Sequence, residues 1–95
     1  MKTIIHNQTH KEFSDVSRAV EYFFYNKFKN YSKAKKWELH LWLEEGQDDQ
    51  SIYRCGAHLI RPGKRNLFVN RVASNITDAL RKTSHVVLNN TVKGK

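Results

Sequence analysis

Residues 37–45 read WELHLWLEE, and their strict alternation of apolar and polar side chains constrains the fold more than any other segment. Every second residue from Trp37 to Leu43 is apolar, and the residues between them are Glu38, His40 and Trp42. A period of two is typical of a β-strand that has one buried face. The segment is therefore predicted to be a strand of a sheet that is covered on one side.

Two further strands are predicted after this one. The polar segment EGQDDQ is typical of a turn, so the segment SIYRCGAHLI that follows it would pair with residues 37–45 as an antiparallel hairpin. RPGKRN turns the chain again, and LFVNRV after it is predicted to be the next strand. A short strand rich in β-branched residues is also predicted at residues 3–6, near the start of the chain. The predicted core-facing residues are Tyr53, Cys55, Ala57 and Leu59 in one strand, and Leu67 and Val69 in the next.

An amphipathic helix is predicted before the first alternating strand. Ser14 or Asp15 can cap it, and apolar residues then recur at three- and four-residue spacing to about Tyr31. These apolar positions are Val16, Val20, Phe23, Phe24 and Tyr31. The opposite side of the helix carries Arg18, Tyr22, Tyr25, Lys29 and Lys33. Lys27 falls near the middle of the apolar side, so we expect its stem to lie along apolar surface while its ammonium reaches water.

A second helix is predicted from about Ile76 to Leu88. Asn75 and Asp78 have the spacing of a capping box at its start. The positions expected on its apolar side are Ile76, Leu80, Thr83 and Val87. Residues from about 89 to 95 are weak helix formers and are expected to fray. The chain is thus predicted to be one α+β domain over residues 1–95, in the order β-α-β-β-β-α, with two helices on one face of a four-stranded sheet.

The charge of the chain indicates a polyanionic partner. Seventeen Lys and Arg stand against nine Asp and Glu, which gives a formal net charge of +8, and four of the acids crowd into residues 44–49. Such a field attracts nucleic acid, an anionic membrane or an acidic protein. No apolar run approaches the roughly 18 residues of a membrane span. Residues 1–13 lack the apolar core of a signal peptide, and a lone cysteine forms no internal disulfide, so the expected location is the cytoplasm.

No group of residues is typical of an active site or a metal centre. The five histidines are spread along the chain, without the helical pair or second cysteine that a zinc site would need. The acids of residues 44–49 are expected in a solvated hairpin loop, where burial cannot raise a carboxyl pKa. Cys55 lies between core positions and is interpreted as a small buried residue. We therefore expect no enzymatic activity, no metal, no cofactor and no small-molecule substrate.

The basic residues form three clusters, on the first helix and its following loop, on the turn before the last strand, and on the last helix and tail. RNA is the favoured polyanion, because cations contact phosphates while aromatic rings can stack on bases. The predicted RNA-binding residues are Arg18, Lys27, Lys29, Lys33, Lys35, Lys36, Arg61, Lys64, Arg65, Lys82, Lys93 and Lys95. The candidates for base stacking or protein contact are Tyr22, Tyr25, Trp42 and Phe68.

A second interpretation uses the polar side of the predicted sheet. Exposed Trp42, His40 and Phe68 would form a patch that docks another protein, or a second copy of the chain as a weak homodimer. The residues alone leave both interpretations open.

Four segments resemble the short ribosome hibernation factors, a family that includes hibernation-promoting factor and ribosome-associated inhibitor A. FSDVSR resembles the first turn of the family's first helix, and WELHLWLE resembles its alternating second strand. AHLIRPGKRNLFV is similar to its strand, glycine turn and strand, and SNITDAL to the opening of its last helix. The resemblance covers nearly the whole chain, and the chain length matches that of the short members.

The resemblance implies a fold like that of a double-stranded-RNA-binding domain, lodged on the small ribosomal subunit where tRNA and mRNA pass. It implies contacts to ribosomal RNA from basic residues on both helices, which here are Arg18, Lys27 and Lys29, followed by Lys82, Lys93 and Lys95. The end of the last helix departs from the family, because VVLNNTVKGK replaces a dense basic run. KAKK and RPGKR add charge near the loops, which favours a binding surface displaced toward them.

Overall fold

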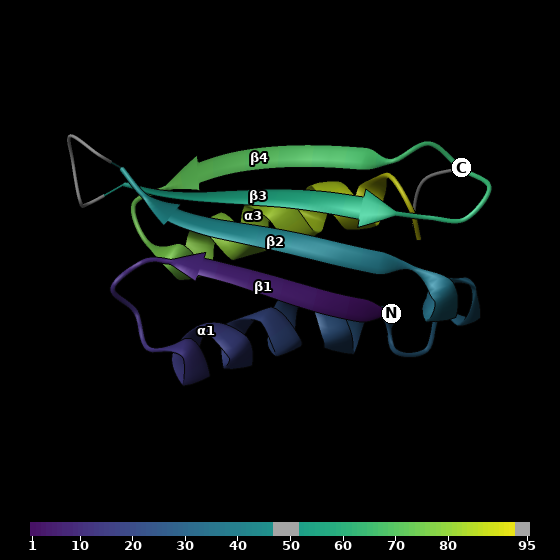
Figure 1. Cartoon of the computed structure of the whole chain (residues 1–95), viewed down its shortest axis with the longest axis horizontal. Helices are drawn as coiled ribbons and strands as arrows, with labels where there is room; N and C mark the ends of the chain where they lie inside the picture. Colours follow the sequence, from purple (N-terminus) through teal and green to yellow (C-terminus); the bar gives the residue numbers. More distant parts are fainter. Residues whose placement is uncertain (47–51, 93–95) are drawn as a thin grey trace.

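A computed structural model of the chain describes residues 1–46 and 52–92, and it shows a four-stranded sheet with helices on one face (Figure 1). The predicted α+β fold and its order β-α-β-β-β-α are confirmed. The strands are β1 (Lys2–Gln8), β2 (Glu38–Glu45), β3 (Tyr53–Ile60) and β4 (Leu67–Ala73). The helical segments are α1 (Phe13–Val20), the π-helical turn η1 (Glu21–Tyr25), α2 (Asn26–Phe28), the 3-10 turn η2 (Ser32–Lys36) and α3 (Ile76–Asn89).

The strands lie in the order β1-β2-β3-β4, and the helical crossover that joins the first two makes them parallel. β2 pairs with β3, and β3 with β4, in antiparallel register, so the predicted hairpin is confirmed. The alternation read from the sequence is also confirmed, because Leu39, Leu41 and Leu43 are fully buried while the residues between them are only partly buried. The helices cover this side, and we call the other side the open face of the sheet.

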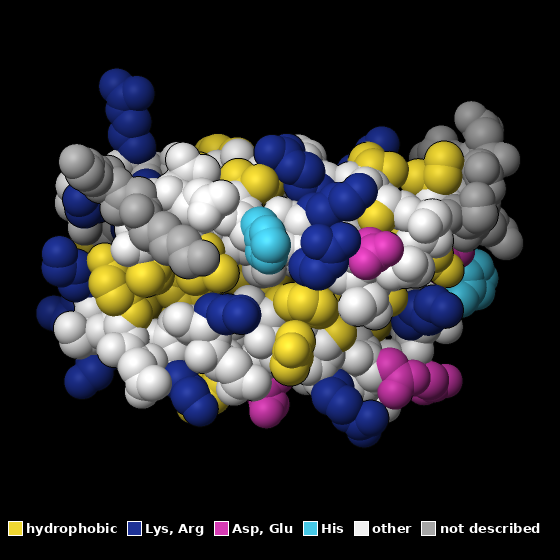
Figure 2. Space-filling view, turned by 180° about the vertical axis from the view of Figure 1, so that it is seen from behind, with side chains coloured by type: hydrophobic (Ala, Val, Ile, Leu, Met, Phe, Trp, Pro, Cys, Tyr) yellow, Lys and Arg dark blue, Asp and Glu magenta, His cyan; other side chains and the backbone are white. Residues whose placement is uncertain are grey.

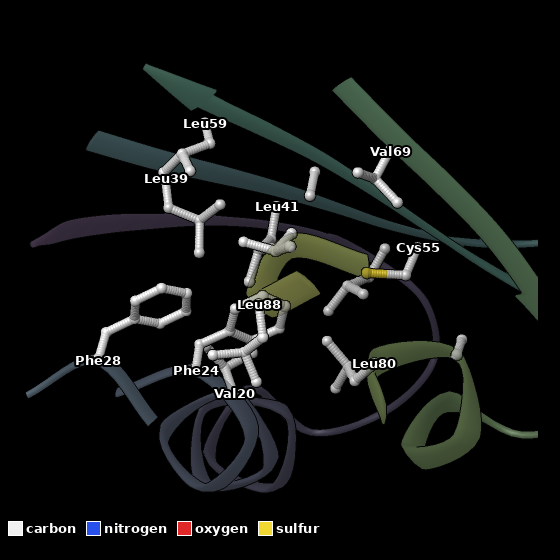
Figure 3. Packing of buried hydrophobic residues seen from close by; sticks show 14 of the residues in the cluster. Val20, Phe24, Phe28, Leu39, Leu41, Cys55, Leu59, Val69, Leu80 and Leu88 are labelled. Carbon is white, nitrogen blue, oxygen red and sulfur yellow. The ribbon is translucent and has the colours of Figure 1, made fainter. Parts of the chain in front are cut away.

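The core lies between the helices and the covered side of the sheet (Figure 3). From the crossover it takes Val20, Phe24 and Phe28, and from α3 it takes Leu80 and Leu88. The sheet contributes Leu39, Leu41, Cys55, Leu59 and Val69. Thr83 is buried as well, and its hydroxyl donates to the Ala79 carbonyl, so this polar group is satisfied within α3.

The position of Lys27 in the first helical segment is corrected by the structure. In a regular α-helix, side chains four residues apart are rotated by about 40° around the helix axis, so a row at this spacing gradually leaves the core side. The π-helical turn η1 contains one extra residue, and this offsets the accumulated rotation. Val16, Val20, Phe24 and Phe28 therefore all face the core, at a constant spacing of four. Phe28 fills the place that a regular wheel gives to Lys27, and Lys27 is exposed.

The ends of the helices also differ in part from the prediction. The N-cap of α1 is Glu12, which makes no side-chain capping bond, and Ser14 and Asp15 lie within the first turn. The helical backbone ends at Phe28, before Tyr31 is reached. The predicted start of α3 is confirmed: Asn75 is its N-cap, and the Asn75 Oδ1 accepts a hydrogen bond of 2.8 Å from the Asp78 amide.

Candidate nucleic-acid interface

Two of the predicted basic clusters meet at one end of the sheet because of the strand register. β2 begins at Glu38 and β3 ends at Ile60, and these two residues are paired. The turn η2 before β2 and the turn of residues 61–66 after β3 are therefore brought together, although they are far apart in the sequence. The end of α3 reaches the same end of the sheet (Figure 1). The strand pairing thus assembles a site from three separate segments.

These segments enclose a hollow of ≈ 640 Å³, which we call the basic cleft. Its lining residues are Tyr31, Ser32, Lys33, Lys35, Lys36, Trp37, Arg61, Pro62, Lys64, Asn90 and Thr91. Five of them are cations, and no acid is found among the lining residues that the structure describes. A concave surface lined by one sign of charge concentrates its field, so the cleft is suited to anions such as phosphate.

An aromatic wall supports the cleft. Trp37 is buried, and its ring packs edge to face against Phe28 and Tyr31 at centroid distances of 6.0 and 5.6 Å. The guanidinium of Arg61 lies over the Trp37 ring, with its Cζ 5.9 Å from the centroid. One terminal nitrogen of Arg61 also donates to the Arg65 carbonyl at 3.0 Å, which fixes the guanidinium further. The cleft therefore pairs mobile ammonium groups with one planar cation held in place.

The other predicted RNA-binding residues are spread over the helical face of the molecule. Lys29 lines a smaller surface pocket of ≈ 170 Å³, together with Tyr31 and Lys35, which also line the basic cleft. Arg18 lies in a shallow hollow with Thr77, and Lys82 is exposed on α3. Figure 2 shows this face, where the left end carries dark blue Lys and Arg and no magenta acid among the coloured residues. Lys93 and Lys95 lie outside the described residues.

The candidate stacking residues lie on two surfaces. Tyr22 and Tyr25 are exposed at 63% and 58% on the helical side. Trp42 lies on the open face, stacked on His6 at 4.9 Å, and the row of rings continues through His40 and His58. Phe68, which is 69% exposed, ends the row 4.1 Å from His58. Because these rings cover one another's faces, the row offers ring edges to a partner, with Phe68 as its most exposed member.

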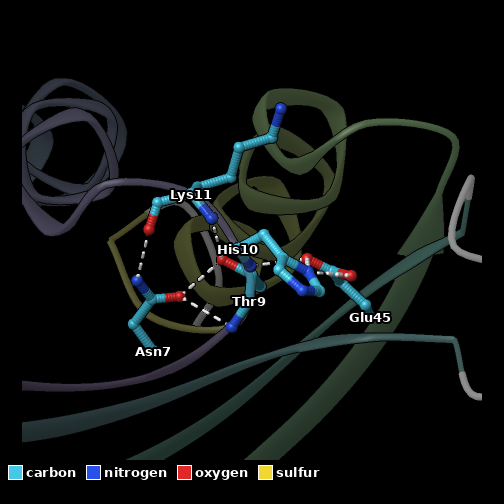
Figure 4. A network of polar contacts seen from close by, with 5 residues as sticks. All are labelled: Asn7, Thr9, His10, Lys11 and Glu45. Carbon is cyan, nitrogen blue, oxygen red and sulfur yellow. Dashed lines mark hydrogen bonds and ion pairs between the residues drawn. The ribbon is translucent and has the colours of Figure 1, made fainter.

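Glu45 differs from the prediction of a solvated acidic loop. It ends β2, and its side chain is only 10% exposed. Its carboxylate accepts hydrogen bonds from the His10 amide at 2.6 Å and from the His10 ring at 2.8 Å, in a network that includes Asn7 and Thr9 (Figure 4). The backbone bond from His10 is the main cause that holds the pKa of Glu45 below its usual 4.5. The contact is structural, and Asp48 and Asp49 lie outside the described residues.

The remaining candidates for chemistry are accounted for by packing. Burial raises the pKa of the Cys55 thiol to about 11, which makes it a poor nucleophile at neutral pH. Within residues 1–46 and 52–92, no three His, Cys, Asp or Glu side chains are grouped to hold a metal ion. No helix in this part of the chain has the length and apolar character needed to cross a membrane.

Sequence reasoning missed several residues of the cleft. Tyr31 and Trp37 were predicted only as core residues, yet both also form its wall. Asn90 and Thr91, which come from the end of α3, were expected in a frayed tail. The hairpin pattern already implied that residues before β2 and after β3 meet, but nothing in the sequence indicated that α3 would extend to them.

Comparison with known proteins finds the same fold in solved structures. No protein-family model and no curated protein matches the chain. The N-terminal domain of Protein Y from Thermus thermophilus superimposes with a TM-score of 0.73 at 13% identity, covering 95% of this chain and 94% of that chain. A ribosomal subunit interface protein from Coxiella burnetii does so with a TM-score of 0.77 at 10% identity, covering 98% and 96%.

The chain has the fold of these two proteins. Since both likenesses extend over nearly the whole of each chain, the fold predicted from the family resemblance is confirmed. At such low identities, the likeness of fold does not assign binding-site residues of those proteins to positions of this chain.

Proposed function

We propose that this protein is a divergent ribosome hibernation factor that occupies the tRNA and mRNA path of the small subunit. The observation that carries the proposal is the basic cleft, in which five cations converge on a fold shared with a ribosomal subunit interface protein. In this proposal the protein acts by occupying space and needs no chemistry. It works in the cytoplasm, where it silences idle ribosomes.

Phosphate contacts would supply most of the affinity. Lys33, Lys36 and Lys64 line the cleft, and their ammonium groups are not paired with any acid in the described part of the chain. If about six phosphates are neutralised, affinity falls by about 10³-fold or more between 50 and 200 mM salt. The helical cations Arg18 and Lys82 would add contacts outside the cleft, as the family resemblance implies.

Co-sedimentation with small ribosomal subunits in a sucrose gradient tests this function. The variant Lys35→Glu/Lys64→Glu reverses one charge in η2 and one in the turn of residues 61–66, and we expect this variant to be lost from the subunit fraction. The matched control Arg54→Glu/Arg71→Glu makes the same change in net charge at exposed strand residues away from the cleft. Equal losses in both variants, or an interaction that does not respond to salt, would count against the cleft as the ribosome-binding surface.

The open face supports a second candidate function, self-association. Phe68 and Val72 are 69% and 48% exposed on this side of β4, next to the row of stacked rings. An exposed apolar strip on an edge strand is typical of a contact surface. Sedimentation equilibrium of the wild type and Phe68→Ser tests it. A monomer at all concentrations, with Phe68→Ser unchanged, would remove this candidate.

A further inference from the structure

The basic cleft contains more than a phosphate site requires. The lining of the cleft includes ammonium groups from η2 and from the turn of residues 61–66, together with aromatic rings, a planar guanidinium and hydrogen-bond acceptors. We propose that the cleft holds one unpaired nucleoside phosphate, with its base beside Arg61 and its phosphate among the lysines. The inference rests on the proposed function only in taking the nucleotide to come from ribosomal RNA, since an unpaired RNA nucleotide and a free nucleotide share this chemistry.

The base would lie against the plane of Arg61. This guanidinium is held by the Trp37 ring beneath it and by the Arg65 carbonyl, so it keeps its orientation without a ligand. Guanidinium planes and aromatic rings are the groups on which proteins stack unpaired bases. Tyr31, partly exposed at the same wall, supplies a second ring. A stacking surface held in place loses little entropy when the base arrives.

The end of α3 would read the edge of the base. Asn90 donates from its Nδ2 to the Val86 carbonyl at 2.8 Å, which orients the amide and leaves Oδ1 as an acceptor. Thr91 donates to the Val87 carbonyl at 2.6 Å, so its hydroxyl oxygen can also accept. Both residues line the cleft. Two fixed acceptors suit a base that carries an exocyclic amino group, such as adenine.

The phosphate would lie among Lys33, Lys36 and Lys64, which line the cleft on flexible stems. The volume of ≈ 640 Å³ falls within the roughly 300–1,000 Å³ of sites for small ligands. A duplex presents paired bases inside its stack, where a concave site of this size cannot reach their faces. The shape of the cleft therefore favours a single unpaired nucleotide over a double helix.

Chemical shifts of the two tryptophan indole N–H groups provide the test. Trp37 lies in the wall of the cleft, and Trp42 lies on the open face as an internal reference. We expect adenosine 5′-monophosphate to shift the Trp37 signal and leave the Trp42 signal in place. Its affinity should exceed that of adenosine and of inorganic phosphate by at least about tenfold, because stacking and charge act together. Equal affinity for inorganic phosphate, or a shift only at Trp42, would overturn the proposal.

Matched variants separate the two halves of the site. Arg61→Lys keeps the charge and removes the plane, so the preference for the nucleotide over inorganic phosphate should fall about tenfold. Arg81→Lys makes the same change on α3 outside the cleft, and it should leave the preference unaltered. Lys64→Ala should weaken the binding of both anions, whereas the control Lys11→Ala removes one exposed lysine outside the cleft and should leave both affinities unaltered. A preference that survives Arg61→Lys would contradict the assignment of the base.

Oligonucleotides distinguish the two sources of the nucleotide. A single-stranded adenine hexamer that binds at least about tenfold more tightly than the mononucleotide, and loses affinity with salt, identifies RNA as the source. Equal affinities identify a free nucleotide. A duplex that shifts the Trp37 signal as strongly as the single strand would refute the requirement for an unpaired base. If the protein binds the nucleotide but does not co-sediment with the subunit, the proposed ribosomal function is wrong and the nucleotide site stands. If it co-sediments but does not bind the nucleotide, the nucleotide site is wrong and the proposed function stands.

Discussion

Replacing Phe28 by Ala tests the π-helical turn that sets the phase of the first helical segment. Phe28 is 3% exposed and packs against Trp37, the ring that supports Arg61 in the cleft. Truncation of a buried Phe costs about 3–5 kcal/mol. An open surface pocket of ≈ 170 Å³ already lies beside Phe28, so neighbouring side chains have room to move into the space left by the ring, and we expect the lower value, about 3 kcal/mol.

Urea unfolding followed by circular dichroism measures this loss, and thermal unfolding should show a midpoint lowered by roughly 12 °C or more. Lys27→Ala is the matched control, because a regular α-helix would put Lys27 in the core and the structure exposes it. We expect it to change the unfolding free energy by no more than about 0.5 kcal/mol. Similar losses in the two variants, or a larger loss at Lys27, would refute the phase assigned to η1.

Two further predictions concern ionisable groups. Because its contacts with His10 lower the pKa of Glu45, they stabilise the fold above the usual value of 4.5, and this stability is lost as the pH falls through the lowered pKa. The urea midpoint of the wild type should therefore fall more between pH 6 and pH 3 than that of Glu45→Gln; parallel curves would contradict it. The Cys55 thiol, with its pKa raised to about 11, should react with a disulfide reagent at pH 8 about a hundredfold more slowly in the native than in the unfolded protein. Equal rates would show that the thiol is exposed.

The sheet could be predicted from the sequence because a period of two is a local property. Leu39, Leu41 and Leu43 alternate without interruption, so the covered side of β2 followed directly. The start of α3 was equally local, since Asn75 and Asp78 contact each other within one turn. Neighbouring residues do not determine which side of the first helix faces the core. The π-helical turn is selected by packing against the sheet, and no residue between 21 and 25 marks it.

Contacts between separate elements could not be predicted from the sequence either, because they depend on how distant segments pack together. His10 and Glu45 meet because the parallel pairing of β1 and β2 brings the end of one strand beside the end of the other. The basic cleft was predicted in part, since the additional charge of KAKK and RPGKR favoured a surface near these loops. Its third side, the end of α3, depends on how that helix packs across the sheet, and the weak helix formers there pointed to a frayed tail.

Trp37 connects the stability of the fold to the geometry of the cleft. It is the first core residue of the alternating segment, and it is also the ring on which Arg61 lies. Core substitutions next to it should therefore alter both unfolding and ligand affinity, whereas Lys33, Lys36 and Lys64 are exposed and can change affinity alone. Basic residues on exposed turns can thus vary without loss of the fold. This explains how a chain with a thin basic run at its end can still hold a concentrated cationic site on the same scaffold.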